Sequence, residues 1–344
     1  MEPVITPPKP AQRARPGARG RWLALLAIVA ALVFVAAARM WLGGAGPTEA
    51  DTRVLLELRG LRVASAAITG ASLALAGALL QGLLRNPLAS PDLLGLGSGA
   101  GLGVMVAIYT TFAAGGGLAD PGGAGATGAA IAGSLGALTV VYIASQRGGY
   151  VEPTSLVLVG VIVGIMCAAG VRLFQHLLPD GGFAANRLMI GALRDDVSGD
   201  TLWVGLGLLA ASLVVAMLFA RAIDASQFSD DEARSMGVPL GAVRTVQFAA
   251  AALLSAGAVV IAGPVGFIGL VCPHVARMLV GGRASWLLPA SVLLGAGAVI
   301  GADTLVAAIK AGAPGLGRVP VGVVTALVGG PVFIAMLRKH SRAL

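Results

Sequence analysis

The sequence predicts an all-α, polytopic membrane protein with about ten transmembrane helices, and three observations support this fold class. Hydrophobic residues make up 57% of the 344 residues, and charged residues make up only 12%. Soluble domains carry roughly a quarter charged residues, about twice as many. The mean hydropathy is +0.88. A helix that crosses a bilayer needs about 20 predominantly apolar residues, and this chain contains about ten stretches that qualify.

The expected helices follow one another with short connections. They lie near residues 22–42, 63–84, 93–113, 124–144, 154–177, 202–222, 243–262, 265–281, 286–309 and 319–337, the eighth being short. The chain also holds 51 glycines. Three G-x-x-x-G spacings, at 99–103, 160–164 and 297–301, favour close approach of helix backbones where lipid offers no hydrophobic drive.

The basic residues indicate the orientation, because positively charged segments stay cytoplasmic. Both ends of the chain are basic, through Lys9, Arg13, Arg15, Arg19, Arg21, Arg338, Lys339 and Arg342. With an even number of spans, both termini are therefore expected in the cytoplasm. We interpret residues 1–21 as a disordered basic tail and residues 22–340 as a single transmembrane domain. A cleaved signal peptide is the alternative, but the first apolar run is longer than a typical signal core.

The segment RNPLASPDLLGLGSGA, residues 85–100, interrupts the helical pattern after the second span. Irregular backbone within a membrane protein is tolerated only where protein or a water-filled cavity satisfies its polar groups. The break therefore indicates a transport pathway. Counting the spans from a cytoplasmic N-terminus places this segment on the cytoplasmic side. We expect it to be a structural elbow, in which Asn86 and Pro87 cap and turn the chain.

An energy source for transport is missing from the chain itself. Its three lysines, Lys9, Lys310 and Lys339, are not preceded by glycine, so there is no phosphate-binding G-x-x-x-x-G-K-[ST] loop. An ion-coupled secondary transporter is the alternative, and it would need ionisable groups inside the membrane. Asp303 is the one acid well inside an apolar stretch. It serves either as a proton relay or, as we favour, as a partner in an internal ion pair, for instance with Lys310.

Other function classes find no support. His176, His274 and His340 are scattered without nucleophile or metal-ligand spacing, so an enzyme or a metal site is not expected. Cys167 and Cys272 lie in apolar stretches, where cysteine behaves as a small hydrophobe. The net charge of +8 is explained by topology and does not indicate nucleic-acid binding.

The connection at residues 224–244 is the longest cytoplasmic loop expected outside the tails. Ser229 followed by Glu232 fits a capping box, and Gly237 fits a helix stop. These signals predict a short helix at about 230–236. Isolated helices below about 12 residues are marginal in water, so this helix should dock either on its own membrane domain or on a separate motor subunit.

At these residues the chain resembles a known family, the FecCD-type permeases of ABC importers for iron-siderophores, heme and cobalamin. The resemblance covers about residues 50–340. It is carried by LRGLRVASAAITGASLALAGALLQGLLRNPLASPDLLGLGSGA, the loop block EARSMGVP, GPVGFIGLVCPHVAR at 263–277, GAD at 301–303 and VPVGVVTALVGGPVFIAML at 319–337.

The resemblance implies a type II ABC importer permease fold in the bacterial inner membrane. It implies a homodimer with the pathway at its interface, two ATPase subunits that bind ATP and magnesium, and a periplasmic substrate-binding protein. This chain itself would bind no cofactor and catalyse no reaction. The implied cargo is an iron chelate, with heme slightly favoured, a ferric siderophore next and cobalamin third.

The resemblance also suggests docking residues for the binding protein. The family's L-R-x-P-R element matches LRGLR, which gives Arg59 and Arg62, although Leu61 replaces the proline. The alternative is that both arginines anchor a helix end at the interface. Ala307 stands where many members have an arginine, and Arg318 stands in place of a glutamate. We therefore include Lys310 and Arg318 as substitute docking charges.

Three further sets of residues follow from the family's motif positions. The expected ATPase contact comprises Ser229, Asp230, Asp231, Glu232, Ala233, Met236, Gly237 and Val238. Thr154 and Ser155 match the cytoplasmic gate, with ordinary helix packing as the alternative. Arg172 and His176 lie one turn apart near the outer end of the fifth span, where a guanidinium suits a heme propionate and an imidazole suits the iron. Interfacial anchoring is the alternative for both.

Overall fold

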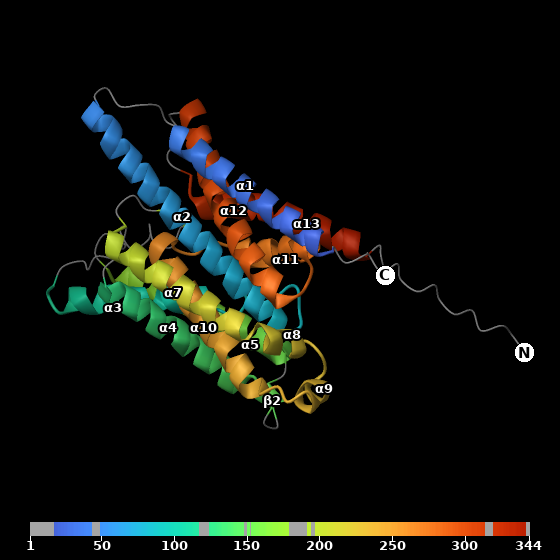
Figure 1. Cartoon of the computed structure of the whole chain (residues 1–344). Helices are drawn as coiled ribbons and strands as arrows, with labels where there is room; N and C mark the ends of the chain where they lie inside the picture. Colours follow the sequence, from blue (N-terminus) through green and yellow to red (C-terminus); the bar gives the residue numbers. More distant parts are fainter. Residues whose placement is uncertain are drawn as a thin grey trace, which may run out of the picture.

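The computed structural model describes residues 17–42, 49–116, 124–147, 150–151, 153–178, 191–193, 197–313 and 319–341. Within them the chain is a helical bundle (Figure 1). Its elements are α1 (Ala18–Trp41), α2 (Glu49–Leu83), α3 (Leu96–Ala113), α4 (Ala124–Ala144), β1 (Gln146–Arg147), β2 (Tyr150–Val151), α5 (Pro153–Leu177), α7 (Gly199–Leu218), α8 (Ala220–Ala225), α9 (Asp230–Ser235), α10 (Leu240–Ala262), α11 (Ile268–Val280), α12 (Ala284–Gly312) and α13 (Val321–Ser341).

The bundle confirms the all-helical fold class, and helix is found at each predicted span. Eight of the described helices are long and apolar enough to cross a membrane, while α11 and the apolar part of α13 are shorter. Three boundary predictions are wrong. Helix α2 begins at Glu49 rather than near residue 63, and the span expected at 202–222 is divided between α7 and α8. Helix α1 already begins at Ala18, so residues 18–21 are helical rather than part of a disordered tail, and residues 1–16 lie outside the described residues. The two-residue strands β1 and β2 form a small antiparallel hairpin.

Helices α2 and α10 form the centre of the bundle. In the most apolar 18-residue stretch of α2, 83% of the residues are buried, and in that of α10 the share is 78%. The corresponding shares are only 11% in α1 and 28% in α5. Helix α2 packs along α12, α10 and α11, and it runs through the middle of the bundle in Figure 1. Helices α1 and α5 therefore leave broad apolar faces at the surface of the single chain.

Glycines bring the central helices into backbone contact. A Cβ atom on Gly70 would overlap the carbonyl oxygen of Gly295 in α12, and one on Gly77 would overlap that of Gly269 in α11. Of the three predicted G-x-x-x-G spacings, 99–103 and 160–164 do lie against neighbouring backbone. The pair at 297–301 meets only side chains of α1, at 3.8 Å from each ideal Cβ position, so it makes no close approach.

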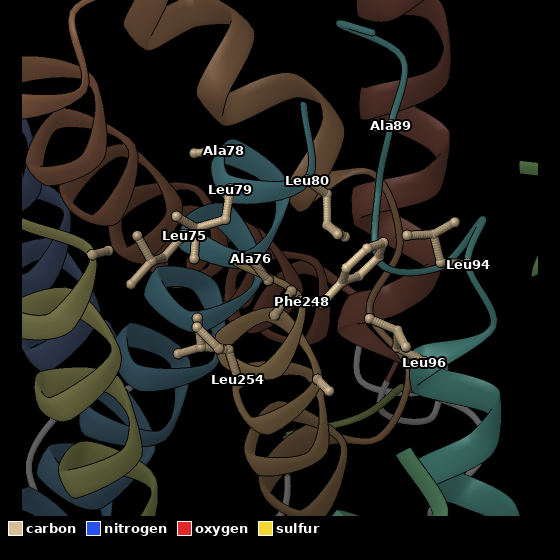
Figure 2. Close-up of a cluster of buried hydrophobic side chains, with 14 of the residues drawn as sticks. Leu75, Ala76, Ala78, Leu79, Leu80, Ala89, Leu94, Leu96, Phe248 and Leu254 are labelled. Atoms are coloured by element: carbon tan, nitrogen blue, oxygen red, sulfur yellow. The ribbon is translucent and has the colours of Figure 1, made fainter. Parts of the chain in front are cut away.

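The segment between α2 and α3 is only partly the expected cytoplasmic elbow. Its start matches the prediction, since the Leu88 amide donates to Asn86 Oδ1 at 2.9 Å. The chain then rises into the bundle, and Gly95 meets Gly164, eleven residues into α5, which is about 16 Å along that helix. Figure 2 shows Ala89, Leu94 and Leu96 of this region packed near Phe248 of α10. The break is therefore built into the core.

Candidate functional site

The loop between α8 and α10 folds as its sequence predicts. Helix α9 has the complete capping box: Ser229 Oγ accepts from the Glu232 amide at 3.3 Å, and the Ser229 amide donates to Glu232 Oε2 at 2.9 Å. The chain leaves the helix through Gly237, whose φ of 76° is in the left-handed region that favours glycine. The capping box at its start and the glycine turn at its end therefore define this six-residue helix.

An ionic clamp holds α9 against the membrane domain. The Asp230 carboxylate accepts from Arg85 Nη2 at 2.6 Å, and both of its oxygens accept from Arg244 Nη2 at 2.8 Å. Arg85 also donates to the Ser226 carbonyl at 3.0 and 3.1 Å. Since Arg85 follows α2 and Arg244 belongs to α10, the clamp connects the loop to the two central helices. We refer to Arg85, Asp230 and Arg244 as the Asp230 clamp.

The opposite side of α9 remains accessible. Ala233 is completely buried against the bundle, whereas the side chain of Asp231 is 98% exposed and Met236 is 53% exposed. Both docking alternatives for this helix are therefore compatible with the structure. One face rests on the membrane domain, and the other face is available to another protein.

Carboxylates around this loop have shifted pKa values. At Asp230 partial burial opposes ionisation, but hydrogen bonds from Arg244 and Arg85 outweigh it and lower the pKa. Hydrogen bonds from Ser229 lower the pKa of Glu232. Burial raises the pKa of Asp224, which accepts from the Ala284 amide at 2.7 Å and so caps the start of α12. The clamp and the capping box thus both favour the ionised carboxylate.

At the other end of the bundle, Asp303 lies between two arginines. Its carboxylate accepts from Arg39 Nε at 2.5 Å and from Arg62 at 2.6 and 2.8 Å. Asp303 is 1% exposed, Arg39 7% and Arg62 5%. Arg62 also donates to the Leu193 carbonyl at 3.1 Å. We call Arg39, Arg62 and Asp303 the outer charge cluster; it connects α1, α2 and α12.

This cluster confirms internal pairing of Asp303 and corrects its partner. Lys310 is exposed in the last turn of α12, two turns beyond Asp303, and the partners are Arg39 and Arg62 instead. The expected docking residue Arg62 is consequently buried in the cluster rather than presented at the surface. Arg59 is partly buried and donates to the Met40 carbonyl at 3.0 Å. The remaining docking candidate, Arg318, lies outside the described residues.

Helix α5 carries both the expected gate and the expected cargo residues, at opposite ends. Ser155 is partly buried in its first turn, and the side chain of Thr154 lies outside the described residues. Arg172 lines a cavity of about 290 Å³ together with Ser98, Gln175 and Pro264. His176 is exposed one turn further on and is not among the described residues that line this cavity.

Sequence reasoning missed a polar network inside the inner half of the bundle. Gln81 Nε2 donates to the Leu270 carbonyl at 3.2 Å, and Gln81 Oε1 accepts from Arg277 at 3.2 Å. Gln247 Nε2 donates to the Leu79 carbonyl at 3.1 Å. Single glutamines in apolar helices were the only available signal. Among the described residues, no group of three or more His, Cys, Asp and Glu side chains is placed to hold a metal ion.

These features define a helical membrane protein whose central helices α2 and α10 are tied to a short capped helix, α9. The model of the FecCD transport family matches residues 21–339. The chain therefore belongs to the FecCD transport family.

Curated relatives in this family include permeases for different cargoes. The hemin transport system permease protein HmuU of Yersinia pestis is 34% identical over 85% of each chain. The Fe(3+)-citrate import system permease protein YfmE of Bacillus subtilis is 34% identical over 84% of this chain and 83% of the relative. The cobalamin import system permease protein BtuC of Halobacterium salinarum is 33% identical over 87% and 77%.

A solved structure has the same fold along nearly the whole chain. It is described as an inward-facing conformation of a metal-chelate type ABC transporter, and it covers 93% of this chain and 99% of its own at 25% identity, with a TM-score of 0.78. The chain is thus a membrane-embedded transport component whose homologues are ABC permease subunits.

Proposed function

We propose that this chain is the permease subunit of an ATP-driven importer that moves an iron chelate across the bacterial inner membrane by alternating access. The observation that carries the proposal is α9, a capped helix clamped to α2 and α10 through Asp230, with Asp231 and Met236 exposed on its outer face. A separate ATPase docking on this face would supply the energy source that the chain lacks, and its movement would reach the centre of the bundle directly.

The proposed assembly is a homodimer with two ATPase subunits and a binding protein. Helix α5 supports the dimer, because Leu158, Ile162, Ile165 and Met166 form an exposed apolar face on the single chain. A second copy would cover such a face and enclose the pathway. Thr154 and Ser155, in the first turn of this helix, would then line the cytoplasmic gate.

Among the cargoes we favour heme, then a ferric siderophore, with cobalamin third. The hemin, ferric citrate and cobalamin permeases are 34%, 34% and 33% identical to this chain, so similarity alone does not separate them. The preference rests on Arg172 and His176, because a guanidinium pairs well with a carboxylate and an imidazole is a common iron ligand.

Docking of the binding protein is assigned to Arg59, Lys310 and Arg318, with Arg62 supporting that surface from inside. The change Arg59→Glu is expected to abolish capture of the binding protein, since complementary charges orient association, while ATPase assembly remains. Arg53→Glu, on the same helix and exposed, is the matched control. Unchanged capture by the Arg59 variant would remove this residue from the docking surface.

The secondary-transporter alternative has lost its strongest support. A proton relay needs a carboxylate that gains and loses its proton, whereas Asp303 is 1% exposed and is held in ion pairs with Arg39 and Arg62.

Reconstitution into proteoliposomes tests the proposed function. The chain is combined with its ATPase and its binding protein, and uptake of hemin, ferric citrate, a ferric hydroxamate and cobalamin is measured. ATP-dependent uptake of one chelate is expected, with none from the chain alone under an ion gradient. Gradient-driven uptake by the isolated chain would overturn the proposal.

A further inference from the structure

A cavity with several polar lining residues lies between the first turn of α3, the outer half of α5 and the turn after α10. Ser98, Arg172, Gln175 and Pro264 line it, and its volume is about 290 Å³. We propose that this cavity is a subsite for a carboxylate group of the transported chelate. This assignment rests on the proposed importer function and specifies the cargo that the importer accepts.

Two side-chain donors in the cavity have no partner within the described part of the chain. Gln175 Nε2 is buried and makes no hydrogen bond. Arg172 is exposed and forms none of the ion pairs seen elsewhere in the bundle. A buried donor without an acceptor is destabilising, so a ligand that accepts a hydrogen bond from Gln175 gains affinity. The guanidinium adds a planar fork that matches a carboxylate.

The first turn of α3 contributes to the same cavity. Gly97 and Ser98 line the cavity just after Gly95, the residue that precedes the helix and has a φ of 69°. The amides in the first turn of a helix have no intrahelical partner, and the helix dipole places partial positive charge there. The Ser98 hydroxyl is a further donor. Four donor types, namely guanidinium, carboxamide, hydroxyl and backbone amide, are thus brought to this cavity by α3 and α5.

The charge around the cavity favours an anion over a metal cation. Within the described residues, Arg172 is the one charged group that lines it, and no acidic residue does. The Asp92 carboxylate lies beside the lining residue Gly97, with its Oδ1 3.7 Å from the ideal Cβ position of that glycine. The volume is at the lower end of the range of about 300–1,000 Å³ for small-molecule sites. The cavity therefore fits an acidic arm of a chelate rather than the whole molecule.

The test compares hemin with hemin whose two propionates are esterified, using the complete reconstituted transporter. The ratio of uptake rates is measured for the wild type, Arg172→Gln and Gln175→Leu, always with the same binding protein. Because the binding protein is the same in every assay, any change of this ratio is caused by the permease variant. We expect Arg172→Gln to reduce the preference for free hemin about fivefold, because a water-accessible charge-assisted bond is partly screened, and Gln175→Leu to reduce it about twofold.

One control variant and three further outcomes make the test decisive. Arg53→Gln removes an exposed arginine near the start of α2 and should keep the wild-type ratio. ATPase assembly shows that each variant is folded. An unchanged ratio in Arg172→Gln, or a wild type that carries only the ferric hydroxamate or cobalamin, would overturn the subsite and leave the importer intact. Absence of ATP-dependent uptake of every chelate would instead overturn the proposed function.

Discussion

Asp303 shows how one residue keeps three helices together. Its carboxylate is the counter-ion of both Arg39 and Arg62, and all three side chains are nearly inaccessible. Removing one member of a buried ion pair typically costs about 3–5 kcal/mol, because a charge is left uncompensated. We expect Asp303→Asn to lower the free energy of unfolding by about this amount, measured as a reduced melting temperature in detergent.

A double variant separates this explanation from a loss of ion coupling. Arg39→Met combined with Asp303→Asn removes one of the two unpaired charges and should recover part of the lost stability. A proton relay would instead leave stability unchanged in Asp303→Asn and abolish only uptake. Full stability of the single variant would therefore contradict the structural role of the outer charge cluster.

Asp230 is the second residue on which a prediction depends. We expect Asp230→Asn to reduce uptake per ATP hydrolysed several-fold, because α9 would lose its clamp to Arg85 and Arg244 while its exposed face could still bind an ATPase. The neighbouring Asp231→Asn is the matched control, since that side chain is 98% exposed. Equal coupling ratios in the two variants would rule out the clamp as the transmitting contact.

The pH dependence of this clamp follows from the direction of the shift. The pKa of Asp230 is lowered from its ordinary value of 3.8. A carboxylate with a depressed pKa in the folded state contributes stability that is complete above the unfolded value and is lost as the pH falls through the folded value. Coupling should therefore stay constant around neutral pH. A fall in uptake per ATP hydrolysed between pH 8 and 6, with ATPase activity retained, would contradict an ionised clamp.

Individual residue roles were harder to predict than the helices that carry them. The capping box at Ser229 and Glu232 was predictable because all of its atoms come from four consecutive residues. The partners of Asp303 were not, because Arg39 is 264 positions away along the chain. A basic residue at the end of an apolar helix has the same sequence pattern whether it anchors at the interface or pairs inside the bundle.

At the scale of elements, helix contacts depend on glycines at a few positions. Gly77 of α2 lies against the backbone of Gly269 in α11, so even one methyl group would push the two helices apart. We expect Gly77→Ala to destabilise the protein by about 1–3 kcal/mol, the usual cost of overpacking a core. Melting temperature in detergent is the measurement.

The control for this substitution is Gly136→Ala in α4, where an added Cβ would meet nothing within 4 Å. It should be neutral or slightly stabilising, because alanine is the better helix former by about 1 kcal/mol. If both variants melted at the same temperature, the close packing of α2 and α11 would not limit stability.

The eight long apolar helices and the two shorter ones were predictable because length and hydropathy are local properties. The path of residues 84–95 was predictable only at its start, where the asparagine turn is also local. Its rise into the bundle depends on contacts of Gly95 with Gly164 and of Leu94 with Gly160 in α5. Such contacts join segments far apart in sequence, and the spacing of prolines and glycines does not encode them.

At the scale of the whole molecule, the orientation in the membrane remains a prediction from the basic residues. It places the first residues of α2 outside and α9 inside the cell. Two exposed positions report these sides: Arg53 near the start of α2 and Asp231 on α9. Labelling background is low, because the native cysteines Cys167 and Cys272 are both buried.

We therefore expect a membrane-impermeant maleimide to label Arg53→Cys, and not Asp231→Cys, in intact spheroplasts. Inverted vesicles should give the reverse pattern, because α2 carries the chain across the bilayer between these two sides. Co-expression of the ATPase should protect Asp231→Cys in inverted vesicles if α9 is its docking helix, since the thiol would then lie in the interface. Labelling of both variants from the same side would contradict the cytoplasmic placement of α9 and with it the route by which ATP hydrolysis reaches the pathway.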